Sequence, residues 1–241
     1  MQRKRSKLVI IPTYNEIENI EAISRAVFAL EDGFHILVID DGSPDGTAAA
    51  VKTLQESFPD RLFLIERSGK LGLGTAYITG FKWALERNYD YIIEMDADFS
   101  HDPKDLPLLV KACEEGADLS IGSRYADGVS VVNWPIGRIL MSYGASVYVR
   151  SVLRTKIKDS TAGYVCWSNK VLSAINLDNV KMKGYGFQIE MKYTAFRKGF
   201  KIKEVPVVFV NRKAGTSKMS GSIFGEAFWG VIGLRFRKFD K

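Results

Sequence analysis

The sequence has few cysteines and no long apolar run. Cys113 and Cys166 are the only cysteines among 241 residues, too few for a disulfide framework, so a reducing, cytoplasmic location is expected. The apolar run at residues 8–11 is shorter than the core of a signal peptide. Residues 223–234 include an acidic residue and three glycines, and they fall short of the roughly 20 apolar residues that span a bilayer. The sequence therefore predicts a soluble or peripheral protein.

Neither composition nor charge is extreme. Hydrophobic residues make up 46% and charged residues 26% of the chain, which excludes a disordered chain, a collagen-like fibre and a small disulfide scaffold. Lys and Arg number 34 against 28 Asp and Glu, a formal net charge of +6. This excess suits nucleic acid, an anionic membrane surface or a phosphorylated substrate. Because the basic residues are not interleaved with aromatic residues in a recognisable binding motif, we expect no nucleic-acid partner.

Apolar runs and helical patterns alternate through the first half of the chain. Runs without polar alternation predict strands at residues 8–11, 36–39, 62–65, 91–95 and 119–122. Apolar residues at helical spacing predict helices at residues 17–30, 47–58, 75–88 and 106–115. Strands of this buried type separated by helices indicate a doubly wound α/β fold, with a mostly parallel sheet and helices on both faces.

The pattern is looser after residue 124. It predicts a loop at residues 127–134, a long helix at 136–153, strands at 161–167 and 203–210, and a helix near 187–197. The sequence contains no internal repeat, low-complexity linker or clear boundary. We therefore expect residues 1–241 to form a single domain with an elaborated C-terminal part.

Polar clusters follow three of the predicted strands. They occupy residues 12–16, 40–43 and 96–98. Ligands of an open parallel sheet bind beyond the carboxyl ends of the strands, so three such clusters at one edge favour a ligand site. Asn15 and Asp45 are better explained as turn and helix-capping residues.

Asp96 and Asp98 predict a metal site. Carboxylates two residues apart can face one site where the backbone bends, and they repel each other unless a cation joins them. Mg²⁺ or Mn²⁺ suits such oxygen ligands and binds through one or two carboxylates plus substrate phosphates. The glycines at positions 69, 72 and 74 match neither a dinucleotide-binding nor a Walker motif, so dinucleotide binding is disfavoured.

Basic residues in the second half supply the opposite charge. Arg124, Arg138, Arg212 and Lys218 lie in predicted loops or at element ends, and residues 212–218 have the composition of a basic flap. A guanidinium binds phosphate bidentately, and Lys adds a point charge. Any one of these residues alone would be explained as solvated surface. A metal-bound diphosphate facing a basic flap is what phosphorylated donor and acceptor substrates require.

Several long motifs resemble one enzyme family. Residues 9–16 (VIIPTYNE), 39–47 (IDDGSPDGT) and 95–103 (MDADFSHDP) are similar to motifs of the inverting family-two glycosyltransferases. Residues 122–125, 133–135, 184–191 and 212–219 narrow the resemblance to the dolichyl-phosphate, or polyprenol-phosphate, mannosyltransferases. The resemblance runs from about residue 8 to residue 219.

The resemblance implies a glycosyltransferase-A fold, with residues 1–241 as the catalytic domain, and transfer of mannose from GDP-mannose to a polyprenyl phosphate with inversion. It implies nucleotide contacts from Pro12, Tyr14, Glu16, Ile39 and Asp41. The metal and diphosphate would be surrounded by Asp96, Ala97 and Asp98, with Ser100 at a donor-site position where some relatives carry Gln. The phosphates would be bound by Arg124, Arg212 and Lys218, with Arg138 as a weaker candidate for the acceptor. Asp98, Arg124, Arg212 and Lys218 are the expected catalytic residues.

Residues 222–241 combine an apolar stripe with a basic end. The stripe consists of Phe224, Phe228, Val231 and Ile232, and the basic residues are Arg235, Arg237, Lys238 and Lys241. Such a segment suits a helix in a membrane interface, and it suits equally a terminal helix packed on the domain. Because the implied acceptor is a lipid, we expect peripheral association with the cytoplasmic face of a membrane in either case.

Two alternatives remain open at this point. One is a polyprenyl-phosphate glucosyltransferase, or a transferase for another sugar, that uses a UDP-sugar. The other is a non-catalytic nucleotide-sensing module, which the presence of Asp96, Asp98, Arg212 and Lys218 argues against.

Overall fold

A single large sheet organises the molecule. The computed structural model describes residues 5–211 and 221–237. Its seven-stranded sheet has the order β3-β2-β1-β4-β7-β5-β8. The strands are β1 (Lys7–Thr13), β2 (Phe34–Asp40), β3 (Leu62–Glu66), β4 (Tyr91–Glu94), β5 (Leu119–Ser123), β7 (Val165–Ser168) and β8 (Ile202–Pro206). Every pairing is parallel except those of β7, which runs antiparallel to both β4 and β5.

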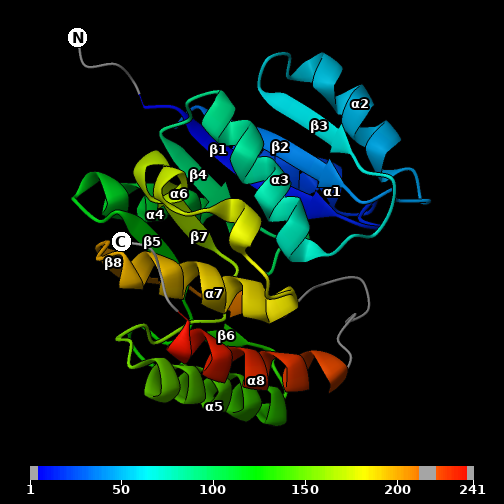
Figure 1. The fold of residues 1–241 in the computed structure, drawn as a ribbon. Helices are drawn as coiled ribbons and strands as arrows, with labels where there is room; N and C mark the ends of the chain where they lie inside the picture. Colours follow the sequence, from blue (N-terminus) through cyan, green and yellow to red (C-terminus); the bar gives the residue numbers. More distant parts are fainter. Residues whose placement is uncertain (1–4, 212–220, 238–241) are drawn as a thin grey trace.

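Helices cover both faces of the sheet, which confirms the predicted doubly wound α/β class (Figure 1). The helices are α1 (Ile20–Phe28), α2 (Thr47–Ser57), α3 (Leu73–Glu86), α4 (Leu106–Glu114), α5 (Ile136–Leu153), α6 (Asn169–Ala174), α7 (Gly184–Arg197) and α8 (Gly221–Phe236). Short 3-10 turns at Pro103–Asp105 and Leu177–Asn179 complete the connections.

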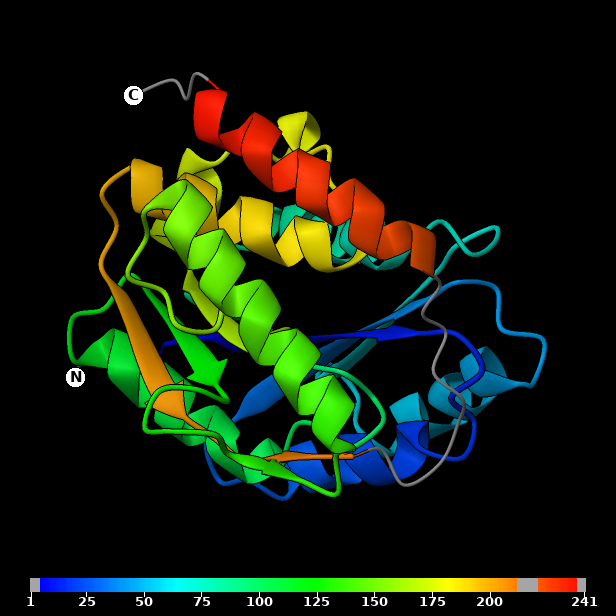
Figure 2. The same cartoon turned by 90° about the horizontal axis from the view of Figure 1, so that it is seen from below.

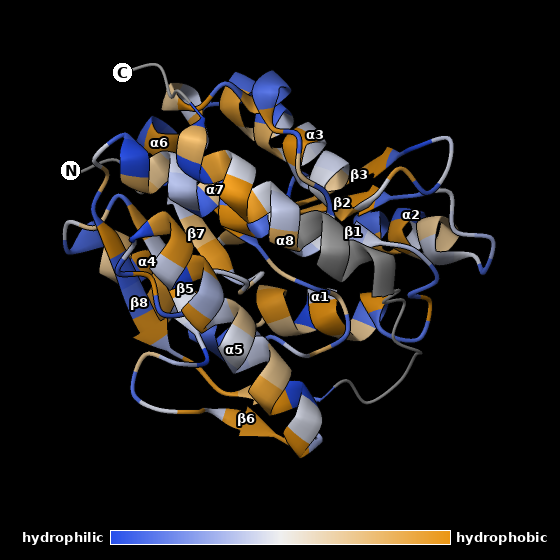
Figure 3. Ribbon diagram, turned by 60° about the horizontal axis from the view of Figure 1, so that its bottom comes forward, coloured by the Kyte–Doolittle hydropathy of each residue, from blue (hydrophilic) through white to orange (hydrophobic). Residues whose placement is uncertain are grey.

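Side-chain alternation along the strands divides the core in two. In β1, Val9 and Ile11 pack with residues of α1, α2 and α4 on one face. Leu8 and Ile10 point the other way and pack with α3, α6 and α7. Each strand is apolar on both sides because both sides are covered, and the strands of the sheet are predominantly hydrophobic in Figure 3.

A glycine sets the distance between α3 and the sheet. A Cβ at Gly80 would lie 2.8 Å from Ile10 Cδ1, closer than real side chains approach. The bare backbone at this position therefore lets α3 pack directly on β1.

Helix α8 lies outside α7, which itself packs on the sheet, and α8 also contacts α5 (Figure 2). Val149 and Leu153 of α5 and Ile189 of α7 pack against Val231 and Leu234 of α8. The terminal segment, for which packing on the domain was one of two predictions, therefore does pack through α8. None of the helices within the described ranges is long and apolar enough to cross a membrane.

The sequence predictions were wrong at four places in the second half. Residues 203–210 form two strands in different sheets, since β8 pairs with β5, whereas β9 (Phe209–Val210) pairs with β6 (Val131–Val132). The predicted loop at 127–134 thus contains β6. The strand expected from residue 161 begins only at Val165, and helix α6 was not predicted. Elements of two to six residues are too short to show a periodicity in the sequence.

Candidate active site

The polar clusters predicted to meet at one sheet edge do meet there. Parallel pairing places Thr13 of β1 beside Asp40 of β2, and Ile10 of β1 beside Glu94 of β4. Asp40 is buried, and its carboxylate accepts hydrogen bonds from Thr13 Oγ1 at 2.9 Å and from the Ser43 amide at 2.9 Å. Asp40 therefore fixes the ends of β1 and β2 relative to each other.

The neighbouring Asp41 is tied to the segment that leads into α3. Arg67 Nε donates to Asp41 Oδ1 at 2.6 Å, and the same guanidinium reaches Thr75 Oγ1 at 2.8 Å. Lys70 Nζ lies 4.9 Å from the centre of the Tyr14 ring. Tyr14 and Asp41, two of the predicted nucleotide residues, thus flank the glycine-containing turn before α3.

Other predicted nucleotide residues differ in their exposure. Ile39 is fully buried in the core next to this edge, so its side chain packs in the core rather than on the surface of the site. Pro12 is half-buried, and Glu16 is part of the loop after β1, where its amide donates to Thr47 Oγ1 at 3.1 Å. These bonds hold the loops after β1 and β2 together.

The turn roles predicted for Asn15 and Asp45 are confirmed, whereas the N-cap of α2 is Gly46. Asn15 has a left-handed φ of 57°, and its amide donates to Ser43 Oγ at 3.0 Å. Asp45 accepts from the Thr47 amide at 3.0 Å, at the first residue of α2. Both residues shape the loops after β1 and β2.

The loop after β4 holds Asp96 and Asp98 in a bent backbone. The Asp96 amide donates to Nδ1 of the buried His101 at 3.0 Å, and the Ser100 amide donates to Asp98 Oδ1 at 3.0 Å. Burial lowers the pKa of His101 to about 4, so the ring is neutral at pH 7 and Nδ1 serves as the acceptor. Ala97 is 3% exposed and packs in the core between these carboxylates.

Acidic side chains give the end of β4 a negative electrostatic potential. Tyr77 is fully buried beneath it, and burial, with Asp96 and Glu94 adding to it, raises the pKa of that phenol well above its ordinary value. Across the described ranges, no group of three or more His, Cys, Asp or Glu side chains is arranged to hold a metal by itself. Asp96 and Asp98 supply two carboxylates, and a hard divalent ion that binds through one or two carboxylates takes its remaining ligands from phosphates and water.

Arg124, at the end of β5, is held in a buried ion pair. Asp159, itself 0% exposed, accepts from Arg124 Nε at 2.7 Å, from NH2 at 2.6 Å and from the Arg124 amide at 3.0 Å. Thr161 Oγ1 accepts a further bond from NH2 at 2.8 Å. Burial alone would lower the pKa of the guanidinium, but Asp159 outweighs burial and raises it above its ordinary value. Arg124 thus stays charged in a fixed orientation.

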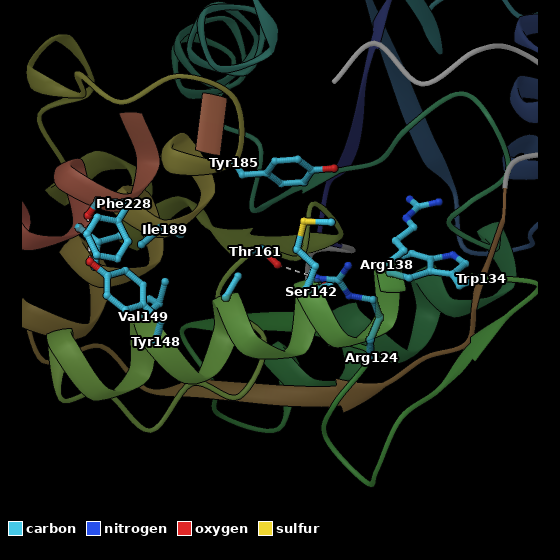
Figure 4. A pocket seen from close by; sticks show the side chains of 13 residues that line it. Arg124, Trp134, Arg138, Ser142, Tyr148, Val149, Thr161, Tyr185, Ile189 and Phe228 are labelled. Carbon is cyan, nitrogen blue, oxygen red and sulfur yellow. Dashed lines mark hydrogen bonds between the residues drawn. The ribbon is translucent and has the colours of Figure 1, made fainter. Parts of the chain in front are cut away.

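A groove of about 430 Å³ opens beside this ion pair, between α5, α7 and α8 (Figure 4). One end carries Arg124, Arg138 and Trp134, whereas the other end is apolar. Its lining consists of Arg124, Trp134, Arg138, Met141, Ser142, Ala145, Tyr148, Val149, Thr161, Tyr185, Ile189, Phe228 and Val231. At the far end, the Tyr148 hydroxyl donates to the Phe228 carbonyl of α8 at 2.9 Å. The groove is an elongated apolar channel with a cationic end.

Arg138 is placed firmly at that cationic end. Its Cζ lies 3.8 Å from the centre of the Trp134 ring, and its NH1 donates to Asn211 Oδ1 at 2.9 Å. Arg212 and Lys218, the other predicted phosphate ligands, lie outside the described residues, so their roles stay predictions.

Three residues that organise the site were not predicted. Arg67 orients Asp41, and Asp159 and Thr161 orient Arg124. Asp159 lies 35 residues from its partner, and no periodicity links the two positions. Thr161 was predicted only as the first residue of a strand at 161–167, which gave no sign of a site.

The sheet, the carboxylates at its edge and the adjoining groove define a sugar-transferring enzyme of a known family. The chain belongs to glycosyl transferase family 2, whose signature matches residues 8–175, and it is a glycosyltransferase. The polyprenol monophosphomannose synthase of Mycolicibacterium smegmatis is 48% identical over 231 residues, which cover 94% of this chain and 87% of that protein. The undecaprenyl-phosphate mannosyltransferase of Micrococcus luteus is 46% identical over 240 residues, which cover 95% of this chain and 98% of that protein.

A solved structure with lower sequence identity has the same fold. The glucosyl-3-phosphoglycerate synthase of Mycobacterium tuberculosis, crystallised with Mn²⁺, uridine diphosphate and phosphoglyceric acid, superposes with a TM-score of 0.71. It is 18% identical, and the match covers 98% of this chain and 80% of that one. The glycosyltransferase-A architecture expected from the sequence is therefore confirmed.

Proposed function

We propose that the protein transfers mannose from GDP-mannose to a polyprenyl phosphate, giving polyprenyl-phosphate mannose and GDP with inversion. The observation that carries this proposal is the groove, because it joins an apolar channel to two arginines next to the carboxylate edge. Relatives at 46–48% identity named for polyprenol and undecaprenyl phosphate mannosyl transfer support the same substrates.

The shape of the groove matches one end of a lipid phosphate. Arg124 and Arg138 would bind the phosphate, and the side chains along α5, α7 and α8 would contact the first isoprene units. A volume of about 430 Å³ is that of a pocket for a drug-sized group. The rest of a long polyprenyl chain therefore lies outside the protein, in the membrane that supplies it.

The surface around the groove fits such a location. Ile136 at the start of α5 is 77% exposed, and Trp229 of α8 is 71% exposed. Large apolar side chains on helices flanking a lipid groove favour contact with the membrane interface. Peripheral association with the cytoplasmic face of a membrane is therefore part of the proposal.

The donor would bind at the carboxyl ends of β1, β2 and β4. Tyr14, Glu16 and Asp41 would contact the nucleotide there. Asp96 and Asp98 would hold Mg²⁺ or Mn²⁺, which supplies Lewis-acid stabilisation of the diphosphate leaving group.

The acceptor phosphate needs orientation rather than deprotonation. One of its oxygens attacks the anomeric carbon as the bond from that carbon to the GDP oxygen breaks. The second pKa of a phosphate monoester is about 6, so the attacking oxygen is already ionised at neutral pH. Arg124 and Arg138 would offset the repulsion between the acceptor phosphate and the donor diphosphate and hold the attacking oxygen in line.

The test is a lipid-extraction assay with radiolabelled GDP-mannose or UDP-glucose, polyprenyl phosphate, and Mg²⁺ or Mn²⁺ against EDTA. We expect label in the lipid phase from GDP-mannose only, and its loss with EDTA. Label from UDP-glucose instead would replace the donor, and no label from either would contradict lipid glycosylation. Arg138→Gln should raise the KM for the lipid, whereas Arg150→Gln, on the same helix outside the groove, should not.

A further inference from the structure

Lys192 of α7 is completely buried, and no role described above uses it. Its side chain is 0% exposed. Nζ donates to the Ala162 carbonyl at 2.6 Å, to the Ser160 carbonyl at 3.3 Å and to Gln188 Oε1 at 3.0 Å. Within the described part of the chain, its hydrogen-bond acceptors are thus carbonyl and amide oxygens rather than carboxylates. An ammonium in such a place needs a structural reason, because burying a charge is costly.

The two backbone carbonyls belong to the turn that presents Arg124 to the groove. Ser160 and Ala162 flank Thr161, whose hydroxyl accepts from Arg124 NH2 at 2.8 Å. Asp159, the residue before them, makes the ion pair with Arg124. Lys192 therefore binds the backbone carbonyls of this turn from inside the protein, and the Asp159 and Thr161 side chains of the same turn bind the Arg124 guanidinium.

The other side of Lys192 connects to the strand that delivers the carboxylates. Gln188 lies one helical turn earlier, and its amide nitrogen donates to Glu94 at the end of β4. Glu94 is 0% exposed and also accepts from Trp167 Nε1 at 2.6 Å. A continuous buried network thus runs from β4, two residues before Asp96, through α7 to the turn at 159–162.

The network is balanced in charge. The Gln188 side chain lies between an acidic and a basic side chain: its amide nitrogen donates to Glu94, and its amide oxygen accepts from Lys192 Nζ at 3.0 Å. Removing one partner alone leaves the other uncompensated, which is strongly destabilising for buried pairs.

We propose that Lys192 is a positioning residue for the acceptor phosphate. It holds the carbonyls of Ser160 and Ala162 so that Asp159 and Thr161 aim the Arg124 guanidinium into the groove. This role rests on the proposed lipid-phosphate acceptor, and it makes α7 the element that aligns the acceptor side with the carboxylate side.

The first test is Lys192→Met, which keeps the length of the side chain and removes its donors. We expect kcat/KM for polyprenyl phosphate to fall by about 100-fold, as for misplacement of a reacting group by about 1 Å. The dissociation constant for GDP should stay at the wild-type value. An unchanged kcat/KM for the lipid, or an equal loss of GDP binding, would overturn the positioning role.

Two further variants separate positioning from folding. Lys7→Met removes another enclosed ammonium, which donates to the Asp32 carbonyl at 3.2 Å, about 20 Å along β1 from its carboxyl end. It should lower Tm without changing the lipid KM. In Glu94→Gln/Lys192→Met both charges are gone, and the Gln188 amide can turn round to accept from the new amide. This double variant should have a Tm close to that of the wild type but a kcat/KM for polyprenyl phosphate as low as that of Lys192→Met. Recovery of the wild-type kcat/KM would overturn the positioning role, because Lys192 would then serve only to balance the charge of Glu94.

A readout independent of activity separates failure of this inference from failure of the proposed function. The Nε–Hε resonance of Arg124, assigned by its loss in Arg124→Lys, reports the ion pair directly. It should shift or broaden in Lys192→Met and stay in place in Lys7→Met. An unmoved resonance in Lys192→Met overturns the inference, even if the wild type proves to glycosylate another acceptor.

Discussion

The Arg124–Asp159 ion pair gives a sharp prediction about stability. Both side chains are almost completely enclosed, at 6% and 0% exposed, and three N–H groups converge on one carboxylate. Asp159→Asn keeps the shape of the side chain but leaves the guanidinium without its counter-charge. Breaking a buried pair from one side costs about 3–5 kcal/mol, and we expect about 3 because the amide oxygen still accepts one bond. For a chain of this length that corresponds to a fall in Tm of about 6–12 °C.

Equilibrium unfolding in urea, followed by tryptophan fluorescence, measures this loss. Glu21→Gln is the matched control, since its ion pair with Arg25 at 2.8 Å lies on the surface with the two side chains 62% and 52% exposed. We expect that control to cost less than about 0.5 kcal/mol. Arg124→Gln added to Asp159→Asn should restore part of the stability, because it removes the orphaned charge. A loss below about 1 kcal/mol for Asp159→Asn, or no recovery in the double variant, would refute the reasoning.

Three further predictions concern the metal site, pH and packing. Asp98→Ala should abolish transfer while the far-UV circular dichroism stays unchanged; near-normal turnover of the purified variant would make the metal assignment wrong. Burial raises the pKa of the half-buried Asp105 to about 6, so the folded state loses stability as the pH rises toward and through 6. Asp105→Asn should therefore raise Tm at pH 8 but not at pH 4. An equal change in Tm at both pH values would contradict this prediction. Gly80→Ala should destabilise the protein by about 1–3 kcal/mol, because the new Cβ would lie 2.8 Å from Ile10. Gly144→Ala is the control and should not destabilise it, because the space around Gly144 is open. Equal losses of stability in the two variants would contradict the packing argument.

Much of the sheet could be predicted because its strands are buried on both faces. Apolar runs such as those of β1 and β2 stand out in the sequence, and the helices between them show a regular spacing. The second half was harder to predict because β6 and β9 are two residues each. β7 is also short, and the turn before it is held by Arg124 and Lys192 rather than by its own sequence pattern.

The candidate site divides in a similar way. The positions of Asp96, Asp98 and Asp41 at the sheet edge could be predicted because their polar clusters follow strands, and a parallel sheet brings the ends of its strands to one edge. Asp159 and Lys192 could not, because a buried charge is explained only by its partners. Arg124 lies 35 residues from Asp159, and the Ala162 carbonyl lies 30 residues from Lys192. Gln188 is four residues from Lys192, but that spacing alone does not reveal a buried charge.

The reversed direction of β7 has a consequence for which part of the chain can vary. Because β7 runs against β4, the turn that precedes β7 arrives at the same edge as the loop that follows β4. The segment between β5 and β7, residues 124–164, can therefore change its length and sequence while β1, β2 and β4 keep their register. If the proposed function holds, changes in this segment would reshape the arginine end of the groove, whereas the strands that carry the predicted nucleotide residues would keep their places.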